Sequence, residues 1–202
     1  MKNIVISTSL VALALSGLPG EAGGAAPPAV TIVDVAYEGA GCPAGSADVA
    51  LSTDKQLLYL GFDQYSVKTV PGGASVARRD CQIRVRMHFE PVWSFAISTV
   101  DYRGFAGLGP GVVGEQVSSY SFAGQPPTPD TKMRTTIVGP FFDNYARRDN
   151  VRKLAHSPCG SPDPVLVIDT AVSVNGVDGE VTVDSLVKKV KHAYHLAWRK
   201  CR

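Results

Sequence analysis

Hydrophobic and polar positions alternate most regularly in the stretch from Cys81 to Gly104. In its first half the apolar set is Ile83, Val85, Met87 and Phe89, and the polar set is Gln82, Arg84, Arg86, His88 and Glu90. Alternation with a period of two, with β-branched and aromatic residues, is typical of a half-buried strand. Because proline cannot donate to a β-ladder, we expect this strand to end at Pro91, and a second strand is predicted from Trp93 to Val100.

Similar apolar or alternating runs predict strands along most of the chain. They lie at residues 30–37, 49–51, 57–62, 115–122, 133–138, 165–174 and 179–183. The Asn175-Gly176 pair predicts a tight hairpin that joins the last two of these strands. Residues 104–114 hold five glycines and one proline, which predicts a loop or a bulged edge. Residues 141–156 are expected to form a short helix or an irregular excursion.

The last part of the chain, residues 186–200, fits two kinds of element. One set of its residues recurs at helical spacing: Leu186, Val187, Val190, Ala193, Tyr194, Ala197 and Trp198. A second set, Tyr194, Leu196 and Trp198, alternates as in a strand that ends at Cys201. Periodicity alone leaves both structures open.

Many short strands separated by turns, without regularly alternating helices, predict an all-β fold. The 20 glycines and 14 prolines among 202 residues are consistent with frequent turns. We therefore expect a mainly antiparallel β-sandwich with long loops and at most one or two short helices. The chain is long enough for a single domain with a substantial core.

The first residues have the features of a secretory signal peptide. Lys2 provides a positive charge, residues 4–18 are largely apolar, and small residues follow. About 15 apolar residues are fewer than the roughly 20 that a membrane-spanning helix needs, which argues against an anchor. We expect a signal peptide at residues 1–20, cleaved between about 17 and 26, and a linker at residues 21–28. Residues 29–202 should then form one secreted, extracellular domain with no membrane attachment.

Export to an oxidising compartment favours disulfides among the four cysteines. Four cysteines allow three pairings, and sequence alone does not choose among them. We expect Cys42–Cys81 and Cys159–Cys201, because each pair closes a loop of about 40 residues within its own half of the chain. No two cysteines lie within a few residues of each other, which argues against a zinc site.

Other chemistries have little support in the sequence. The formal charge of +2 is too small to indicate a nucleic-acid-binding protein. His192 and His195 would share one face of a helix, but no third ligand lies nearby, so we expect no metal and no other cofactor. A Gly-x-Ser-x-Gly nucleophile motif is absent. Glu90 and Asp101 are the best candidates for a carboxylate pair of the glycosidase type.

Two groups of residues are candidates for a binding surface. Asp101-Tyr102-Arg103-Gly104 offers a tyrosine and an arginine, Tyr102 and Arg103, which are residue types favoured at binding hot spots. A structural alternative for this motif is an Asp–Arg or Asp–backbone hydrogen bond at a strand end, with Gly104 at positive φ. Arg84 and Arg86 form a basic stripe that suits an acidic partner or a polysaccharide, but equally a solvated face that discourages edge pairing.

An ordered set of short motifs covers the chain from about residue 30 onward. It runs Gly41-Cys42-Pro43-x-Gly45-Ser46, Leu51-Ser52-x-Asp54, Phe62-x-x-Tyr65, Cys81, Trp93-x-Phe95, Asp101-Tyr102-Arg103-Gly104, Tyr120-x-Phe122, Gly139-Pro140, Ser157-Pro158-Cys159-Gly160, Asp184-Ser185 and Tyr194-x-Leu196-x-Trp198-x-x-Cys201. In this order the set resembles the secreted family known as domain of unknown function 4360, found in fungi and some bacteria. The resemblance implies an exported, β-rich protein with paired cysteines and a strand in the C-terminal segment. It supplies no catalytic residues.

We therefore expect a non-enzymatic extracellular protein that binds another protein or a polysaccharide. One form of this hypothesis is a protease inhibitor that presents a rigid loop, at residues 157–164 or 104–114. The rival hypothesis is a small extracellular hydrolase with carboxylates in a cleft.

Overall fold

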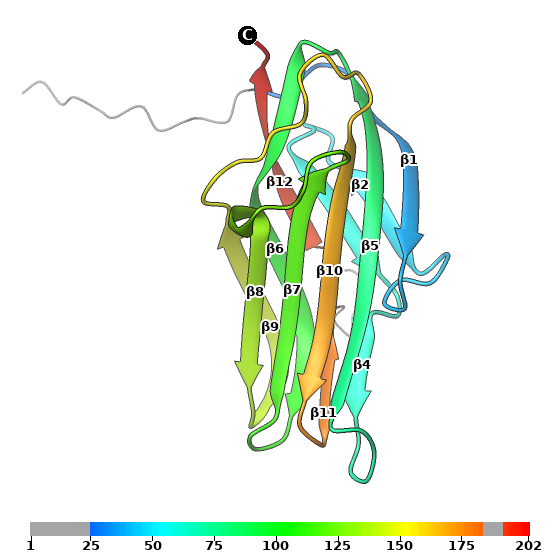
Figure 1. Ribbon diagram of the computed structural model, residues 1–202, viewed down its shortest axis with the longest axis vertical. Coiled ribbons are helices and arrows are strands. Elements are labelled where there is room, and N and C mark those ends of the chain that lie inside the picture. The colour runs from blue at the N-terminus through cyan, green and yellow to red at the C-terminus, as the bar shows by residue number, and fades with distance from the viewer. Residues whose placement is uncertain (1–24, 184–191) are drawn as a thin grey trace, which may run out of the picture.

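The computed structural model describes residues 25–183 and 192–202, which form two β-sheets packed face to face (Figure 1). The strands are β1 (Val30–Glu38), β2 (Ala47–Leu51), β3 (Leu57–Phe62), β4 (Ser66–Thr69), β5 (Val76–Phe89), β6 (Trp93–Leu108), β7 (Val113–Phe122), β8 (Lys132–Val138), β9 (Phe141–Asn150), β10 (Val165–Asn175), β11 (Gly179–Thr182) and β12 (His192–Lys200). Within the described ranges the helical structure is limited to the 3₁₀ turn η1 (Pro129–Thr131), and no helix there could span a bilayer. The predicted β-sandwich is confirmed. The predicted signal peptide lies outside the described residues.

All strand pairings are antiparallel, and the strands divide into two sheets. The five-stranded sheet has the order β1-β5-β10-β7-β8, and the seven-stranded sheet has the order β2-β3-β12-β6-β11-β4, with β9 paired to β6. β6 is the centre of the larger sheet. Its residues 99–101 pair with both β12 and β9, and its residues 105–108 pair with both β11 and β9. β12 and β11 therefore follow one another along one edge of β6, while β9 occupies the other.

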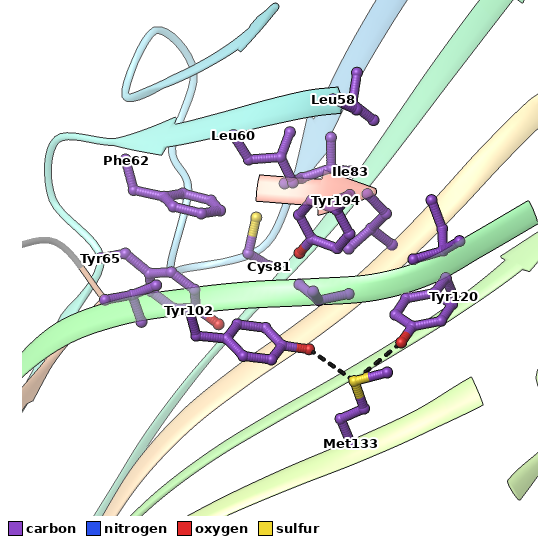
Figure 2. Close-up of a cluster of buried hydrophobic side chains, with 14 of the residues drawn as sticks. Leu58, Leu60, Phe62, Tyr65, Cys81, Ile83, Tyr102, Tyr120, Met133 and Tyr194 are labelled. Atoms are coloured by element: carbon purple, nitrogen blue, oxygen red, sulfur yellow. Dashed lines mark hydrogen bonds between the residues drawn. The ribbon is translucent and has the colours of Figure 1, made fainter. Parts of the chain in front are cut away.

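The core lies between the sheets and is rich in aromatic side chains (Figure 2). The alternation predicted for β5 is confirmed, because its apolar set is buried: Ile83, Val85, Met87 and Phe89. Tyr102 from one sheet and Tyr120 from the other reach the same atom, and their hydroxyls donate to Met133 Sδ at 3.3 and 3.0 Å (Figure 2). These bonds satisfy polar groups that would otherwise be buried without a partner.

The glycine-rich stretch at residues 104–114 was predicted to be a loop or a bulged edge, and the loop is wrong for most of it. β6 continues to Leu108 and β7 begins at Val113, so only residues 109–112 turn. Gly104 faces the core at a point where a Cβ would clash with the carbonyl oxygen of Thr182 and the hydroxyl of Tyr145. This glycine permits a close approach inside the sheet and does not form a turn.

Residues 141–150 form strand β9, so the predicted helix or irregular excursion is also wrong there. β9 lies at the edge of the sheet, beside β6, and Tyr145 is the one buried side chain among its ten residues. An edge strand with most of its side chains in water shows no apolar alternation. The sequence signal on which the prediction depended is therefore missing.

The turn at Asn175-Gly176 does not close a hairpin. β10 lies in the five-stranded sheet, whereas β11 lies in the seven-stranded sheet between β6 and β4. The turn carries the chain from one sheet to the other. The same crossing occurs at the neighbouring turns β4–β5, β6–β7 and β8–β9, which lie together at one end of the sandwich (Figure 1).

The C-terminal segment is a strand from His192 to Lys200, as the resemblance implied. Tyr194, Leu196 and Trp198 all face the core and are nearly inaccessible to solvent. The helical alternative is wrong for these residues, and residues 186–191 lie outside the described part of the chain.

The structure contains the two expected disulfides, and no described cysteine is free. Cys42–Cys81 ties the segment after β1 to β5, with 5.4 Å between the Cα atoms. Cys159–Cys201 ties the loop between β9 and β10 to the chain just after β12, with 5.8 Å between the Cα atoms. The bridges span 39 and 42 residues, so each removes considerable freedom from the unfolded chain.

Removal of either bridge should lower the free energy of unfolding by about 2–5 kcal/mol, because the unfolded chain regains its loop entropy. We expect this loss for the pair of substitutions Cys159→Ala and Cys201→Ala, measured by urea unfolding against the unmodified protein. A non-reduced peptide map of the unmodified protein is the control. It should show the Cys42–Cys81 and Cys159–Cys201 linkages, and any other pairing would contradict this fold.

Candidate functional site

The outer face of the seven-stranded sheet carries a row of polar side chains at its centre. Asp101 on β6 lies opposite Arg148 of β9 on one side and opposite Ala193 of β12 on the other. Residues directly opposite each other in an antiparallel pair place their side chains on the same face. The chain neighbours Val100 and Tyr102 are buried, so the row faces away from the core.

Asp101 is held by two basic side chains. Arg148 Nε donates to Oδ1 at 2.6 Å, and Arg148 Nη2 donates to Oδ2 at 2.8 Å. His195 Nε2 on β12 lies 2.8 Å from the same Oδ2. The hydrogen bonds from Arg148, with a smaller contribution from His195, lower the pKa of Asp101 from 3.8 to about 2. Asp101 is therefore ionised at any physiological pH.

Towards one end of β6 the same face becomes aromatic. Phe142 on β9 lies opposite Gly107 on β6 and is 83% exposed. Its ring packs edge-on against Phe105, with 5.1 Å between the ring centroids. A hollow of about 500 Å³ lies beside these rings and is also bordered by Lys68 and Glu180. This volume is in the range of ligand pockets, about 300–1,000 Å³.

Towards the other end, the face offers hydrogen-bonding groups and one more ring. Thr99 Oγ1 donates to Asn150 Oδ1 at 3.1 Å. Across the sheet, Tyr59 on β3 lies between Ala193 and Ala50 on the neighbouring strands. Tyr59 is half-buried between these small neighbours.

These outer-face residues form one continuous line along β6, and we call them the β6 strip. They are Phe142, Phe105, Arg103, Asp101, Arg148, His195 and Thr99. At about 3.3 Å per residue and 4.8 Å between strands, the strip and the strands beside it cover roughly 26 Å along β6 and 14 Å across.

The sequence matches the family described as Domain of unknown function (DUF4360) over residues 28–201. The chain belongs to this family. A relative from Arthroderma benhamiae, described as an uncharacterized secreted protein, is 36% identical over 192 residues, which is 91% of this chain and 77% of the relative. This DUF4360 protein is thus a secreted β-sandwich stabilised by two disulfides, as the resemblance implied.

Solved structures similar to the chain include two proteins of low sequence identity. The enzymatically active domain of tailspike protein 4 of bacteriophage CBA120 has a TM-score of 0.30 at 13% identity, and the match covers 85% of this chain but 20% of the tailspike chain. TmCBM61 in complex with beta-1,4-galactotriose has a TM-score of 0.29 at 9% identity, with 84% of this chain and 90% of TmCBM61 covered. Likenesses this weak support no inference about the function of the DUF4360 protein.

The four residues predicted for a binding surface do not lie together. Arg103 is exposed on the β6 strip, but Tyr102 is 2% exposed and points into the core, so its place in that prediction is wrong. Arg84 and Arg86 are exposed on β5, which belongs to the other sheet. They face away from the strip, on the opposite side of the sandwich.

A β-bulge turns Tyr102 towards the core. The register between β6 and β12 shifts between His195 and Leu196. Before the shift Phe95 and Ile97 face the core, and after it Val100 and Tyr102 do. An extra residue in one strand reverses which alternate set faces inward. Continued from Phe95 without the bulge, the alternation would have placed Tyr102 outside.

The two histidines considered as metal ligands lie on opposite faces of β12. His192 is buried in the core against the rings of Phe62 and Tyr102, whereas His195 faces outward to Asp101. The described residues contain no group of three or more potential metal ligands. The strand therefore separates the pair that a helix would have brought together.

The two carboxylates of the hydrolase hypothesis lie apart, and the loop at residues 157–164 of the inhibitor hypothesis is hydrogen-bonded to the sandwich. Glu90 lies in the turn before β6, whereas Asp101 lies in the middle of that strand. In the loop at residues 157–164, Ser157 is buried and its hydroxyl accepts from the Phe95 amide at 3.1 Å. The amides of Met87 and Phe89 donate to carbonyls of the same loop. These bonds hold both ends of the loop to β5 and β6, while residues 158–160 are exposed.

Most residues of the β6 strip were not predicted from the sequence. Phe105 lay in the stretch predicted to be a loop, and Phe142 and Arg148 lay in the stretch predicted to be irregular. The missing signal is long-range pairing, since Arg148 and His195 stand 47 and 94 residues from Asp101. Strand periodicity through residues 99–107 would have grouped Asp101, Arg103 and Phe105 on one face.

The ion pair at Asp101 should make stability depend on pH in acid. The folded pKa, about 2, lies below the unfolded value of 3.8, so the stabilisation is complete above 3.8 and is lost as the pH falls towards 2. Asp101→Asn should cost about 1 kcal/mol at neutral pH, because Arg148 is well exposed. Its unfolding free energy should also fall less between these two pH values. Urea unfolding at both ends of the window measures this, and parallel pH profiles would contradict it.

His192 should make stability depend on pH in a higher window. Burial lowers its pKa from 6.5 to about 4, partly offset by the backbone of Arg103 and Val183. The unfolded chain therefore binds a proton first, and stability should fall by about 3 kcal/mol as the pH drops from 6.5 to 4. His192→Phe keeps an aromatic ring in place and should flatten this decline in urea unfolding. A variant with the wild-type slope would show that another group is responsible.

Proposed function

We propose that this DUF4360 protein is a non-enzymatic extracellular binding protein that engages a polysaccharide along the β6 strip. The observation that carries the proposal is the exposed ring of Phe142, packed against the half-buried ring of Phe105 beside a line of hydrogen-bonding side chains. A large apolar side chain that is 83% exposed contributes little to the core, so its placement is better explained by contact with a ligand.

The surroundings of the rings suit a ligand with many hydroxyl groups. Arg103, His195, Thr99 and Asn150 supply donors and acceptors within the same face. A sugar ring has an apolar face of C–H groups that can pack on an aromatic ring, and hydroxyls at its edge that can bond to such side chains. The strip provides both kinds of contact side by side.

The dimensions of the strip favour a polymer chain over a globular protein partner. A face of roughly 26 by 14 Å has an area near 400 Å². A standard protein–protein interface buries about 800 Å² on each partner, which is about twice as much. A narrow, open line of contacts matches an extended chain of sugar units.

The geometry of the β6 strip supports the hydrolase hypothesis less than it supports binding. Asp101 is engaged by Arg148 through both oxygens and by His195, and its lowered pKa suits neither a general acid nor a proton shuttle near neutral pH. No second carboxylate of the described residues shares a hollow with it. The strip is therefore better suited to holding a ligand than to cleaving it.

The proposal predicts that the two rings carry much of the binding. Phe142→Ala and Phe105→Ala should each reduce retention on a polysaccharide that the protein binds by at least about fivefold, the loss of one aromatic contact. The measurement is a binding assay against a panel of neutral and acidic cell-wall polysaccharides, with urea unfolding to verify the fold.

Val138→Ala is the matched control. Val138 is 61% exposed on β8, in the opposite sheet, so its removal deletes a similar exposed apolar group away from the strip. It should leave retention unchanged. The proposal fails if the protein is retained by none of the polysaccharides, or if the phenylalanine variants bind as the wild type does.

A further inference from the structure

Next to the rings, the β6 strip contains a hollow with an excess of positive charge. It measures about 360 Å³ and is lined by Asp101, Arg103, Ala146, Arg147 and Arg148. Arg103 and Arg148 lie on the outer face with Asp101, whereas Arg147 stands opposite Tyr102 and borders the hollow from edge strand β9, where its Nη1 donates to the Ala146 carbonyl at 3.0 Å. Because arginine stays protonated at all physiological pH values, the hollow carries two positive charges that its own carboxylate does not balance.

The single carboxylate of the hollow, Asp101, already has hydrogen-bond partners within the protein. Asp101 accepts two hydrogen bonds from Arg148, at 2.6 and 2.8 Å, and one contact from His195 at 2.8 Å. It neutralises Arg148 and has little capacity for further partners. Arg103 and Arg147 are both exposed, and neither forms an ion pair with a residue of the described ranges.

Two arginines on the opposite sheet form ion pairs with a neighbouring carboxylate. Arg78 pairs with Asp80, and Arg134 pairs with Glu115 at 2.7 Å. Paired charges of this kind form a solvated face with little net field.

Arg84 and Arg86 on β5 are also exposed and form no ion pair with a described residue, so unpaired arginines occur on both outer faces. What distinguishes the strip is that its unpaired Arg103 lies beside the rings of Phe105 and Phe142.

We infer that the ligand of the β6 strip is an acidic polysaccharide whose sugar carboxylates bind Arg103 and Arg147. The inference rests on the proposed function and adds the chemical class of the ligand. A guanidinium group binds a carboxylate through two parallel hydrogen bonds, and such charge-assisted bonds are about twice as strong as neutral ones. Arg103 is two residues from Phe105 on the same face, about 7 Å away, so one short segment of ligand reaches both the charge and the ring.

The test compares polymers that differ only in charge. Polygalacturonate and alginate serve as acidic probes, and the same polymers with their carboxylates methyl-esterified serve as neutral counterparts. The mature, disulfide-bonded protein should bind at least one acidic probe at least tenfold more tightly than its ester. This preference should weaken as the salt concentration rises from about 0.05 to about 0.5 M, because the arginines are exposed and the Debye length shortens.

The double substitution Arg103→Ala and Arg147→Ala should abolish the preference for the acidic polymer. Because both side chains are exposed, this variant should fold as the wild type does, and urea unfolding verifies it. The matched control is Arg84→Ala with Arg86→Ala, which removes the same charge from β5 on the opposite sheet. The control should bind within about twofold of the wild type, since rim charges that do not touch the ligand have small effects.

Each other outcome contradicts the inference in a distinguishable way. If esters bind as tightly as acids, or neither acid is retained while a neutral polysaccharide is, the acidic ligand is wrong but the proposed function stands. Equal retention of dextran sulfate would overturn selectivity for carboxylates. Equal retention of polyglutamate, unaffected by Phe142→Ala, would indicate an acidic protein partner instead. Retention by no polysaccharide would overturn the proposed function itself.

Discussion

The register of β6 is the constraint on which the rest of the structure depends. This strand pairs with β12, β11 and β9 together, and no other strand among the described residues joins so many neighbours. Because side chains alternate between faces, a slip of one residue would turn Val100 and Tyr102 to solvent and bring Asp101 and Arg103 into the core. Burial of those charges without partners would cost several kcal/mol each. The packed core and the charged outer face are thus two results of one register.

The fold was predictable because its evidence is local. The alternation in β5 depends only on residues within that strand, and glycine and proline indicate the turns. The prediction failed where a local signal has two physical causes. Gly104 permits neighbouring groups to approach the sheet closely, although glycine more often marks a turn. Asn175-Gly176 forms a turn as expected, but a turn sequence does not specify which sheet receives the next strand.

The candidate site was less predictable because it is assembled across the chain. Asp101 and Arg103 could be recognised as polar residues of interest, but their partners come from β9 and β12, and their outward direction depends on the bulge opposite His195 and Leu196. The edge position of β9 removed the alternation that would have identified it. Neither the bulge nor the edge position produces a pattern that can be recognised in a single sequence. Both follow from the pairing of distant segments.

The place of β12 has a consequence for how the protein can be made. This strand, the last in chain order among the described elements, lies inside the larger sheet between β3 and β6. Cys201, which follows it, must also be present before the second disulfide can close. Pairings between segments so far apart in the chain form slowly, since their loops must close first. During synthesis the larger sheet therefore stays open until residues 192–201 emerge. A chain that folds this late remains extended for longer, which is the state in which a secretory channel can carry it across a membrane.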